Sequence, residues 1–477
     1  MPVDDPFTLM APSHSFNFRK NISPFGSCFP DNHRIHSSCT KFEAEQVAGD
    51  QSQIIARTLQ ELETVLLGPD LDCDEFDVGV SLYCAPSVSP YMNWSDSIQQ
   101  HVLNDPRNHP EKLLLLCAQA VSNEDLDCAH NLVNRLNQLV SIYGDPMQRL
   151  AAYTVEGLVA KLKSSGKGLY SALKCKEPPV GDLLSAMQIM YEVCPYIKFG
   201  YMAANGAIAE AFREEDRVHI IDFEIAEGTQ WITLMQALAG RPGGPPHIRI
   251  TGVADPEAWP RSLQAVQQRL TQLADSFKVP FEFHALCMKA SDVQPWMLEV
   301  RAGEALAVNF ALQLHHMPDE SVLTTNPRDR LLRMVRGLNP KVMTVVEQEA
   351  NTNTSPFLAR FAEVMSYYSA VFESLDVTLP RHSRDRVNVE EQCLARDIVN
   401  IIACEGADRV ERHEVLGKWR ARMTMAGFEP YPLSSYVNAT IKSLLESYSD
   451  NYRLKEENGA LCLGWLNRML IAASAWH

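Results

Sequence analysis

The sequence predicts an α/β protein whose core is a doubly wound, mostly parallel sheet ending in an antiparallel hairpin. The run Arg217–Trp231 is typical of a buried strand, a turn with a single glycine and the start of a helix. Apolar, β-branched runs then alternate with helical periodicity as far as Gln348. Near the end, Gly459–Trp476 contains two apolar runs around a short turn, which indicates a β-hairpin.

The strands follow one another with helices between them. Right-handed crossovers through those helices favour a single parallel sheet. After Val218–Asp222, strands are expected at His247–Val253, Phe281–Leu286, Glu304–Phe310 and Lys341–Gln348, and the hairpin at Gly459–Trp465 and Met469–Trp476. Five parallel strands closed by a terminal hairpin resemble the Rossmann-like, methyltransferase-type sheet.

The chain divides at about residue 105. Residues 1–105 are rich in Ser, Pro, Asn and Asp and lack sustained periodicity, so we expect a largely disordered variable region that folding does not need. Residues 106–477 are expected to form the folded domain, with a mainly helical cap at 106–205 and an α/β core at 206–477. Apolar residues recur at helical spacing in the cap without a strict heptad, which favours a globular helical subdomain over a coiled coil.

Composition excludes several classes of protein. The net charge is −16, and residues 1–109 alone hold 15 acidic against 6 basic side chains, so the chain lacks a global basic surface for nucleic acid. The 12 cysteines form no CxxC pair, which favours reduced thiols over disulfides or zinc. No run of 18 apolar residues occurs, so no membrane span is expected.

Several motifs occur in a fixed order between Pro110 and His477. They are a leucine-rich stretch at Leu113–Leu162, the VHIID run at Val218–Asp222, a second leucine-rich stretch at Leu331–Asn353, a PFYRE-like region at Pro356–Gly406, and a SAW region at Arg409–Trp476. In this order they resemble the GRAS family of plant transcriptional regulators. The stretches CLARDIVNIIACEGADRVERHEVLGKWR and MAGFEPYPLSSYVN are similar to its phytochrome- and gibberellin-response branch, among the SCARECROW-like members, and not to the DELLA branch.

The resemblance implies a Rossmann-like core with a helical cap and a non-catalytic regulator in hormone or light signalling. Its leucine-rich helices would bind transcription factors or other signalling proteins, as a homodimer or heterodimer. DNA would be engaged through partners or a local groove, in the nucleus, with a cytoplasmic signalling scaffold as the alternative. The residues expected to maintain the core are Val218, His219, Ile220, Ile221, Asp222, Arg409, Glu411, Trp419, Trp465 and Trp476.

The turn after the first strand bears on catalysis. A methyltransferase needs glycines at alternate positions after its acidic residue, because the backbone must approach the cofactor closely. Here the positions are Glu224, Ala226 and Gly228, and Glu224 would face the cofactor's own carboxylate. We therefore expect no cofactor and no catalysis. The rival hypothesis is a small-ligand-binding protein or an S-adenosylmethionine-dependent enzyme that uses Asp222, Glu224, Gly228 and Asp255.

Other charged residues suggest weaker hypotheses. The spacing of His315 and His316 is not that of a metal-binding helix face, so we expect no metal and expect Asp319 to cap a helix. The alternating charges from Arg409 to Glu414 predict ion pairs on a helix that leads to Trp419. Candidates for a local nucleic-acid groove, chosen for charge near strand ends or helices, are Arg241, Arg261, Arg333, Arg336 and Lys341.

Overall fold

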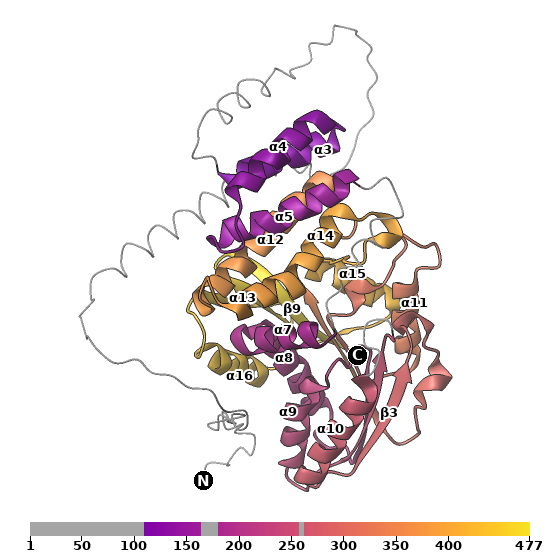
Figure 1. Ribbon diagram of the computed structural model, residues 1–477. Helices are drawn as coiled ribbons and strands as arrows, with labels where there is room; N and C mark the ends of the chain where they lie inside the picture. The colour runs from indigo at the N-terminus through magenta and orange to yellow at the C-terminus, as the bar shows by residue number, and fades with distance from the viewer. Residues whose placement is uncertain (1–108, 164–179, 257–261) are drawn as a thin grey trace, which may run out of the picture. The chain divides into compact units, whose positions relative to one another are not determined.

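The computed structural model describes residues 109–163, 180–256 and 262–477 (Figure 1). All of these residues lie within one compact unit, Glu75–His477. The expectation of disorder for residues 1–105 and the candidate Arg261 fall outside the described residues. No helix in the described ranges is long and apolar enough to cross a membrane.

A nine-stranded sheet forms the centre, in the order β3-β2-β1-β4-β5-β9-β8-β7, with β6 paired to β9. Its first five strands are parallel: β1 (Arg217–Asp222), β2 (His247–Ala254), β3 (Phe281–Cys287), β4 (Ala305–Ala311) and β5 (Val342–Gln348). The strand order reverses at β1, which lies between β2 and β4. This arrangement confirms the predicted doubly wound α/β fold.

The last strand lies inside the sheet. β9 (Arg468–Trp476) is antiparallel to both β5 and β8 (Ala460–Trp465), which confirms the terminal hairpin. Two strands were missed by the sequence analysis. β7 (Tyr452–Glu457) is a half-exposed edge strand with charged residues and no apolar run, and β6 (Pro430–Tyr431) has only two residues.

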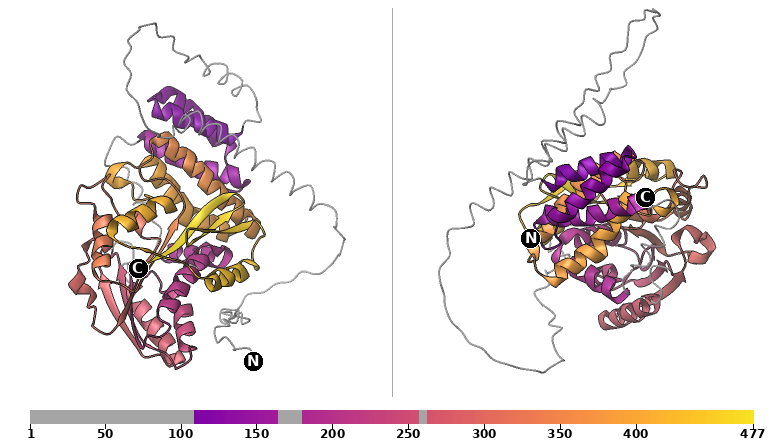
Figure 2. Two further views of the ribbon diagram at one scale, coloured as in Figure 1. Left: turned by 180° about the vertical axis from the view of Figure 1, so that it is seen from behind. Right: turned by 45° about the horizontal axis from the view of Figure 1, so that its top comes forward.

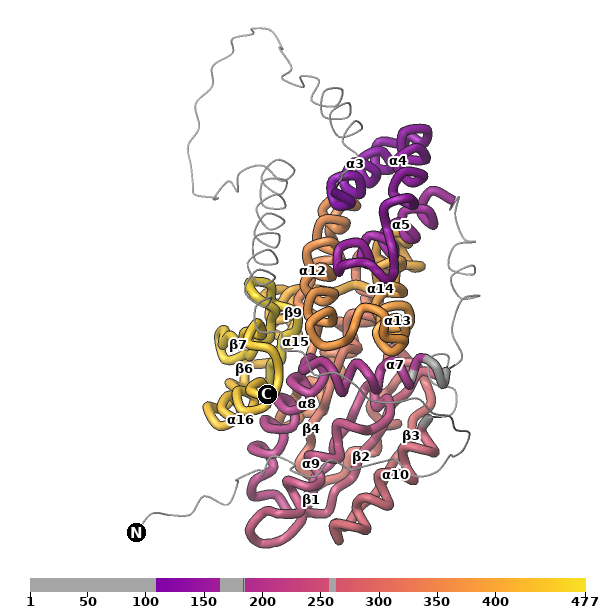
Figure 3. Tube along the Cα trace, turned by 60° about the vertical axis from the view of Figure 1, so that its left-hand side comes forward, coloured from indigo at the N-terminus to yellow at the C-terminus, as the bar shows by residue number. Residues whose placement is uncertain are grey.

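Helices cover both faces of the sheet because side chains alternate along each strand. From β1, Val218 and Ile220 join a core with α8 (Pro195–Ala211), α9 (Thr229–Ala239) and α10 (Ser262–Phe277). On the opposite face, Ile221 packs in a second core with α11 (Pro327–Gly337) and α15 (Leu416–Ala426). Figure 3 shows α9 and α10 beside strands β1 to β3.

The helical cap consists of α3 (Pro110–Ser122), α4 (Leu126–Leu139) and α5 (Pro146–Lys163), which pack on α12 (Phe357–Thr378) and α14 (Ala395–Ala403) (Figures 1 and 2). Leu113, Leu136 and Leu150 are fully buried in this layer. The leucines thus form the core of a helical subdomain, in keeping with the absence of a strict heptad in the sequence.

The remaining helices connect these layers. They are α7 (Val180–Val193), α13 (Arg384–Val389), α16 (Ser435–Leu445), the π-helical turn η4 (Glu390–Leu394), and the 3-10 helices η1 (Ala290–Asp292), η2 (Pro295–Leu298), η3 (Leu314–His316) and η5 (Gly406–Asp408). The π turn carries the fully buried Glu390, whose carboxylate pairs with Arg149 Nε at 2.9 Å and with Arg386. These pairs join α5 to α13.

Candidate functional site

Asp222 ends β1 at the point where the strand order reverses, and its side chain is buried. Trp231 Nε1, from α9, donates to Oδ2 at 2.8 Å. Asn309 Nδ2, from β4, donates to Oδ1 at 3.1 Å, and the Glu224 N–H donates to the same oxygen at 3.3 Å. The two carboxylate oxygens of Asp222 therefore connect β1 to α9 and β4 at the place where the strand order reverses.

Asn309 extends this contact into a buried network. Its Oδ1 accepts hydrogen bonds from Thr344 Oγ1 at 2.8 Å and Gln230 Nε2 at 3.3 Å. Asn205, from α8, donates to the Gln230 carbonyl oxygen at 2.8 Å. A connected polar network of this kind specifies one arrangement of its elements. The sequence analysis missed these amides, although Asn309 is a polar residue inside an otherwise apolar strand.

The backbone of the turn after β1 is also engaged. The N–H groups of Phe223 and Ile225 donate to the carbonyl oxygens of Asn309 and Val253, at 3.1 and 3.2 Å. The Gly228 N–H donates to the Ile225 carbonyl oxygen at 2.7 Å. These three N–H groups of the turn are therefore already used within the chain.

Gly228 is required by geometry. Its φ is +69°, and a Cβ there would lie 2.9 Å from Val266 Cγ1 of α10. Ala226 also adopts a positive φ of 44° and keeps its methyl group. Half-buried Glu224 and Asp255 follow β1 and β2. Asp222, Glu224 and Asp255 thus lie at or just after neighbouring strand ends, while Gly228 precedes α9, and Asp222 and Gly228 serve the fold.

His219, in the middle of β1, is fully buried. Its Nε2 lies 2.8 Å from Thr251 Oγ1, and its Nδ1 accepts from Arg249 NH2 at 3.0 Å. Burial, reinforced by the charge of Arg249, lowers the pKa of His219 to about 3. The histidine is therefore neutral and links β1 to β2.

The Asp222 network predicts a pH-dependent stability. Burial raises the pKa of Asp222 to about 6, although hydrogen bonds from Asn309 and Trp231 oppose the rise. Because the unfolded value is about 3.9, the folded chain binds this proton more tightly, and this group's contribution to stability declines as pH rises from about 4 to about 6. Asp222→Asn is expected to remove this contribution to the slope of unfolding free energy against pH. Denaturant unfolding of both chains between these pH values is the measurement, and equal slopes would contradict the assignment.

The segment from Arg409 to Val415 lies outside any helix, so the predicted helix there is wrong; α15 begins at Leu416. Its side chains bind separate elements, which a local helix would prevent. Arg409 NH1 and NH2 donate to the carbonyl oxygens of Thr352 and Asn353, at 2.6 and 2.9 Å. Arg409 thereby fastens the loop that follows β5.

Buried ion pairs surround this segment. Arg422 Nε lies 2.6 Å from Glu414 Oε2, and Arg422 NH2 lies 2.8 Å from Asp319 Oδ2. Burial alone would raise the pKa of Glu414, but its hydrogen bond from Arg422 and the charge of Arg328 hold it below its usual value. Asp319 does not cap a helix as expected; it accepts from Ser321 N at 3.0 Å in a turn.

A histidine cluster lies on the other side of the same segment. His315, Glu411 and His413 are each at least nine-tenths buried. His315 Nδ1 lies 2.6 Å from Glu347 Oε2, and its Nε2 lies 3.4 Å from Glu411 Oε2. Burial lowers the pKa of His315, but the charge of Glu347 outweighs it and raises the pKa to about 10. Sequence reasoning did not connect these residues, which are about a hundred positions apart.

The basic candidates do not form one surface. Arg241 donates to backbone oxygens of the segment before β1, and Lys341 pairs with Glu215 of that segment. Arg336, on α11, donates to a backbone oxygen at the end of α15, and Arg333 is exposed on α11. Among these described candidates only Arg333 is exposed and makes no ion pair or side-chain hydrogen bond, so the arrangement does not favour a common phosphate-binding groove.

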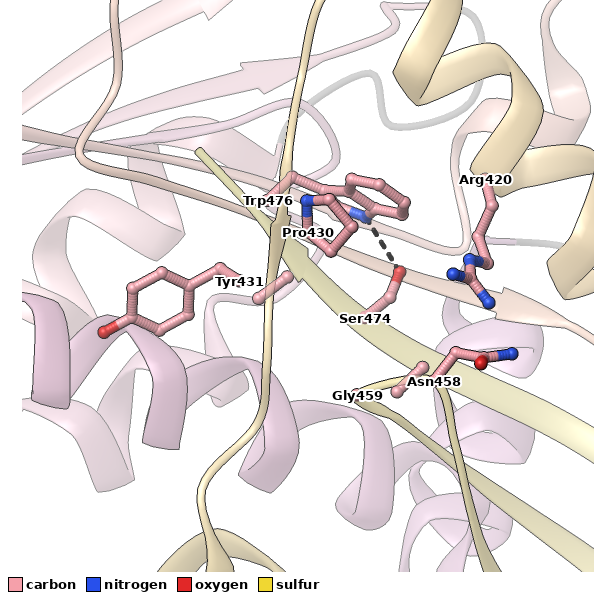
Figure 4. A pocket seen from close by; sticks show the side chains of 9 residues that line it. Arg420, Pro430, Tyr431, Asn458, Gly459, Ser474 and Trp476 are labelled. Carbon is pink, nitrogen blue, oxygen red and sulfur yellow. Dashed lines mark hydrogen bonds between the residues drawn. The ribbon is translucent and has the colours of Figure 1, made fainter.

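The three tryptophans Trp419, Trp465 and Trp476 are each 2% exposed. Beside Trp476 lies a hollow of about 10 Å³ (Figure 4). A hollow of this size holds a water molecule at most. The described surroundings of Trp476 thus fit a packing role.

A larger, open hollow of about 390 Å³ lies after β5. Arg360 and Arg409 line it, but Arg360 binds the Ile401 carbonyl oxygen at 2.9 Å and pairs with Glu405. The guanidinium groups of Arg360 and Arg409 are therefore largely bound by other residues of the chain.

Comparison with known proteins identifies a family, similar sequences and a similar structure. The GRAS domain family matches residues 110–477. The Scarecrow-like transcription factor PAT1 of Arabidopsis thaliana is 57% identical over 438 residues, covering 90% of this chain and 87% of that protein. Chitin-inducible gibberellin-responsive protein 2 of Oryza sativa subsp. japonica is 52% identical over 468 residues, covering 98% of this chain and 84% of that protein. The crystal structure of SCL7 from Oryza sativa matches with a TM-score of 0.70 at 36% identity, covering 78% of this chain and 100% of that one.

Proposed function

The chain belongs to the GRAS domain family, and from this we propose that it is a non-catalytic regulator of transcription in plant signalling that acts through contacts with other proteins. The family match over residues 110–477 carries the proposal. Relatives named as a transcription factor and as a gibberellin-responsive protein support it. A nuclear location is part of the proposal, because a regulator of transcription acts there. A cytoplasmic scaffold is the alternative, and crosslinking to chromatin in plant cells separates the two.

The non-catalytic part of the proposal is supported by the turn after β1. Asp222 is bonded on both oxygens, and Ala226 keeps a methyl group where the backbone would have to approach a cofactor. We expect no detectable binding of S-adenosylmethionine by calorimetry on the full chain, with an active methyltransferase as the positive control. Glu224→Gly is not expected to create binding, since Ala226 remains. Micromolar affinity of the wild-type chain would favour the enzyme hypothesis.

Partner binding is proposed for the outer surface of the cap. The leucines of α3, α4 and α5 are mostly buried, so a partner would contact what remains outside. Leu126 and Tyr143 are 54% and 53% exposed there. Partners identified by proximity labelling in plant cells are expected to be lost from Leu126→Glu and retained by Met425→Glu, which alters a 69% exposed residue on α15. Equal capture by both variants would place the interface elsewhere.

Direct DNA binding is expected to be weak. The net charge is −16, and most described basic candidates are engaged within the chain. In an equilibrium binding assay, the purified chain should bind random duplex DNA with a Kd of roughly 10⁻⁵ M or weaker at physiological salt. Nanomolar binding of the isolated chain to one DNA sequence would reverse this ranking of protein partners over DNA.

A further inference from the structure

The buried histidine cluster has the composition of a metal site. His315 lies in η3, after β4, while Glu411 and His413 lie in the segment before α15. We propose that these three residues bind one divalent transition-metal ion of the Zn²⁺ type. This inference is independent of the proposed function, and it departs from the expectation of no metal that the spacing of His315 and His316 suggested.

Two of the distances between the ligand atoms suit a tetrahedral ion. Glu411 Oε2 lies 3.4 Å from His315 Nε2 and 3.6 Å from His413 Nε2. One ligand atom from each residue can be chosen so that all three lie within 4.8 Å of one another. Zinc bonds of about 2.0–2.1 Å at tetrahedral angles put neighbouring ligand atoms roughly 3.3–3.4 Å apart. The two edges that meet at Glu411 are therefore close to the required length.

Two of these atoms are buried without a hydrogen-bond partner: Glu411 Oε2 and His413 Nε2. Leaving a buried polar group unsatisfied is costly, and a metal ion would satisfy both at once. The hydrogen bonds of Thr352 also favour a lone pair on His413 Nε2. Its hydroxyl donates to the Glu411 carbonyl oxygen at 3.3 Å, so its oxygen is left to accept from His413 Nδ1 at 3.1 Å.

His315 is oriented in the way metal-binding histidines usually are. Its Nδ1 lies 2.6 Å from Glu347 Oε2, while Glu347 Oε1 accepts from the Leu314 N–H at 2.8 Å. A carboxylate that holds the far nitrogen turns the other nitrogen toward the metal and raises its basicity. His315 Nε2 accordingly points to Glu411.

The neighbouring His316 reaches the surface beside the site. The side chain of His316 is 43% exposed, and its Nδ1 lies 3.5 Å from Glu411 Oε1. His316 or a water molecule would complete four-coordination, in the manner of a site with two histidines and one carboxylate. A bound ion would join the end of β4 to the segment before α15. The competing occupant is a proton on His315 Nε2, shared with Glu411.

The test uses the full-length chain, purified with a tag free of histidine runs and without chelator. Elemental analysis is expected to find one Zn²⁺ per chain. Removing it with a chelator should lower the melting temperature, and Co²⁺ should restore it with the visible absorption of a tetrahedral cobalt site. A wild-type chain that gives no such spectrum with excess Co²⁺ would overturn the proposal and leave the proton as the occupant.

Variants assign the site to these residues. His413→Gln is expected to abolish stoichiometric uptake, and Glu347→Gln should weaken Zn²⁺ affinity about 10- to 100-fold by releasing His315. His382→Gln, which removes an exposed histidine outside the cluster, should change neither. Unchanged Zn²⁺ uptake by His413→Gln together with unchanged Zn²⁺ affinity of Glu347→Gln would place the ion elsewhere and refute the assignment. If His413→Gln does not fold, Glu347→Gln and the wild-type Co²⁺ spectrum still decide.

Discussion

Trp476→Ala is expected to reduce the free energy of unfolding by about 3–5 kcal/mol, the usual cost of removing a large buried aromatic side chain. Trp476 is 2% exposed and pairs with Met343 of β5 and with Pro430 of β6. Its indole N–H donates to Ser474 Oγ at 3.0 Å (Figure 4). Because whole domains are stable by only about 5–15 kcal/mol, the variant should melt at a lower temperature and give less soluble protein.

His477→Ala is the matched control for this variant. The residue is adjacent but exposed, and its backbone pairing with Glu429 does not depend on the side chain. It should melt like the wild type. If Trp476→Ala also melted like the wild type yet lost one partner protein, Trp476 would be an interface residue and its assignment to the core would be wrong.

Arg422→Met is expected to destabilise the domain by about 3–5 kcal/mol, because it removes the cation bonded directly to two buried carboxylates and leaves them only Arg328, whose NH1 lies 3.5 Å from each. Glu414 and Asp319 are 1% and 0% exposed, and both bind the Arg422 guanidinium. Methionine keeps much of the volume, so the loss is one of charge compensation. Chemical denaturation monitored by circular dichroism measures the change.

Arg333→Met provides the comparison for Arg422→Met. Arg333 is an exposed arginine on α11, and its replacement should alter stability by less than about 0.5 kcal/mol. Equal effects of the two substitutions would mean that the ion pairs of Arg422 contribute little. A loss in Arg422→Met that disappears at low pH, where the acids are neutral, would support the uncompensated-charge explanation.

The sheet could be predicted because its strands are apolar runs with clear ends. Every parallel strand and the terminal hairpin were located in this way. β7 was missed because an edge strand with one face in water carries alternating charges in place of an apolar run. The segment before α15 was taken for a helix because alternating charges fit helical pairing equally well when the partners are unknown.

The candidate sites were predictable only in part. The position of Asp222 followed from its place at the end of a strand. Its partners did not, because Trp231 and Asn309 meet it only after the strand order is known. The contact between His315 and His413 likewise depends on where two distant loops lie once β4 and β5 have paired. Local periodicity carries no information about such long-range contacts.

The position of β9 has a consequence for synthesis on the ribosome. β9 is the last of the described strands to be made, yet it lies between β5 and β8. Until it emerges from the exit tunnel, β5 has an unpaired edge and β8 lacks its neighbour on that side. An open, apolar strand edge is a template for wrong pairing between chains. The nascent chain therefore carries an exposed β5 edge from the time β5 leaves the tunnel until β9 does, and it is in that interval that chaperones would protect it most.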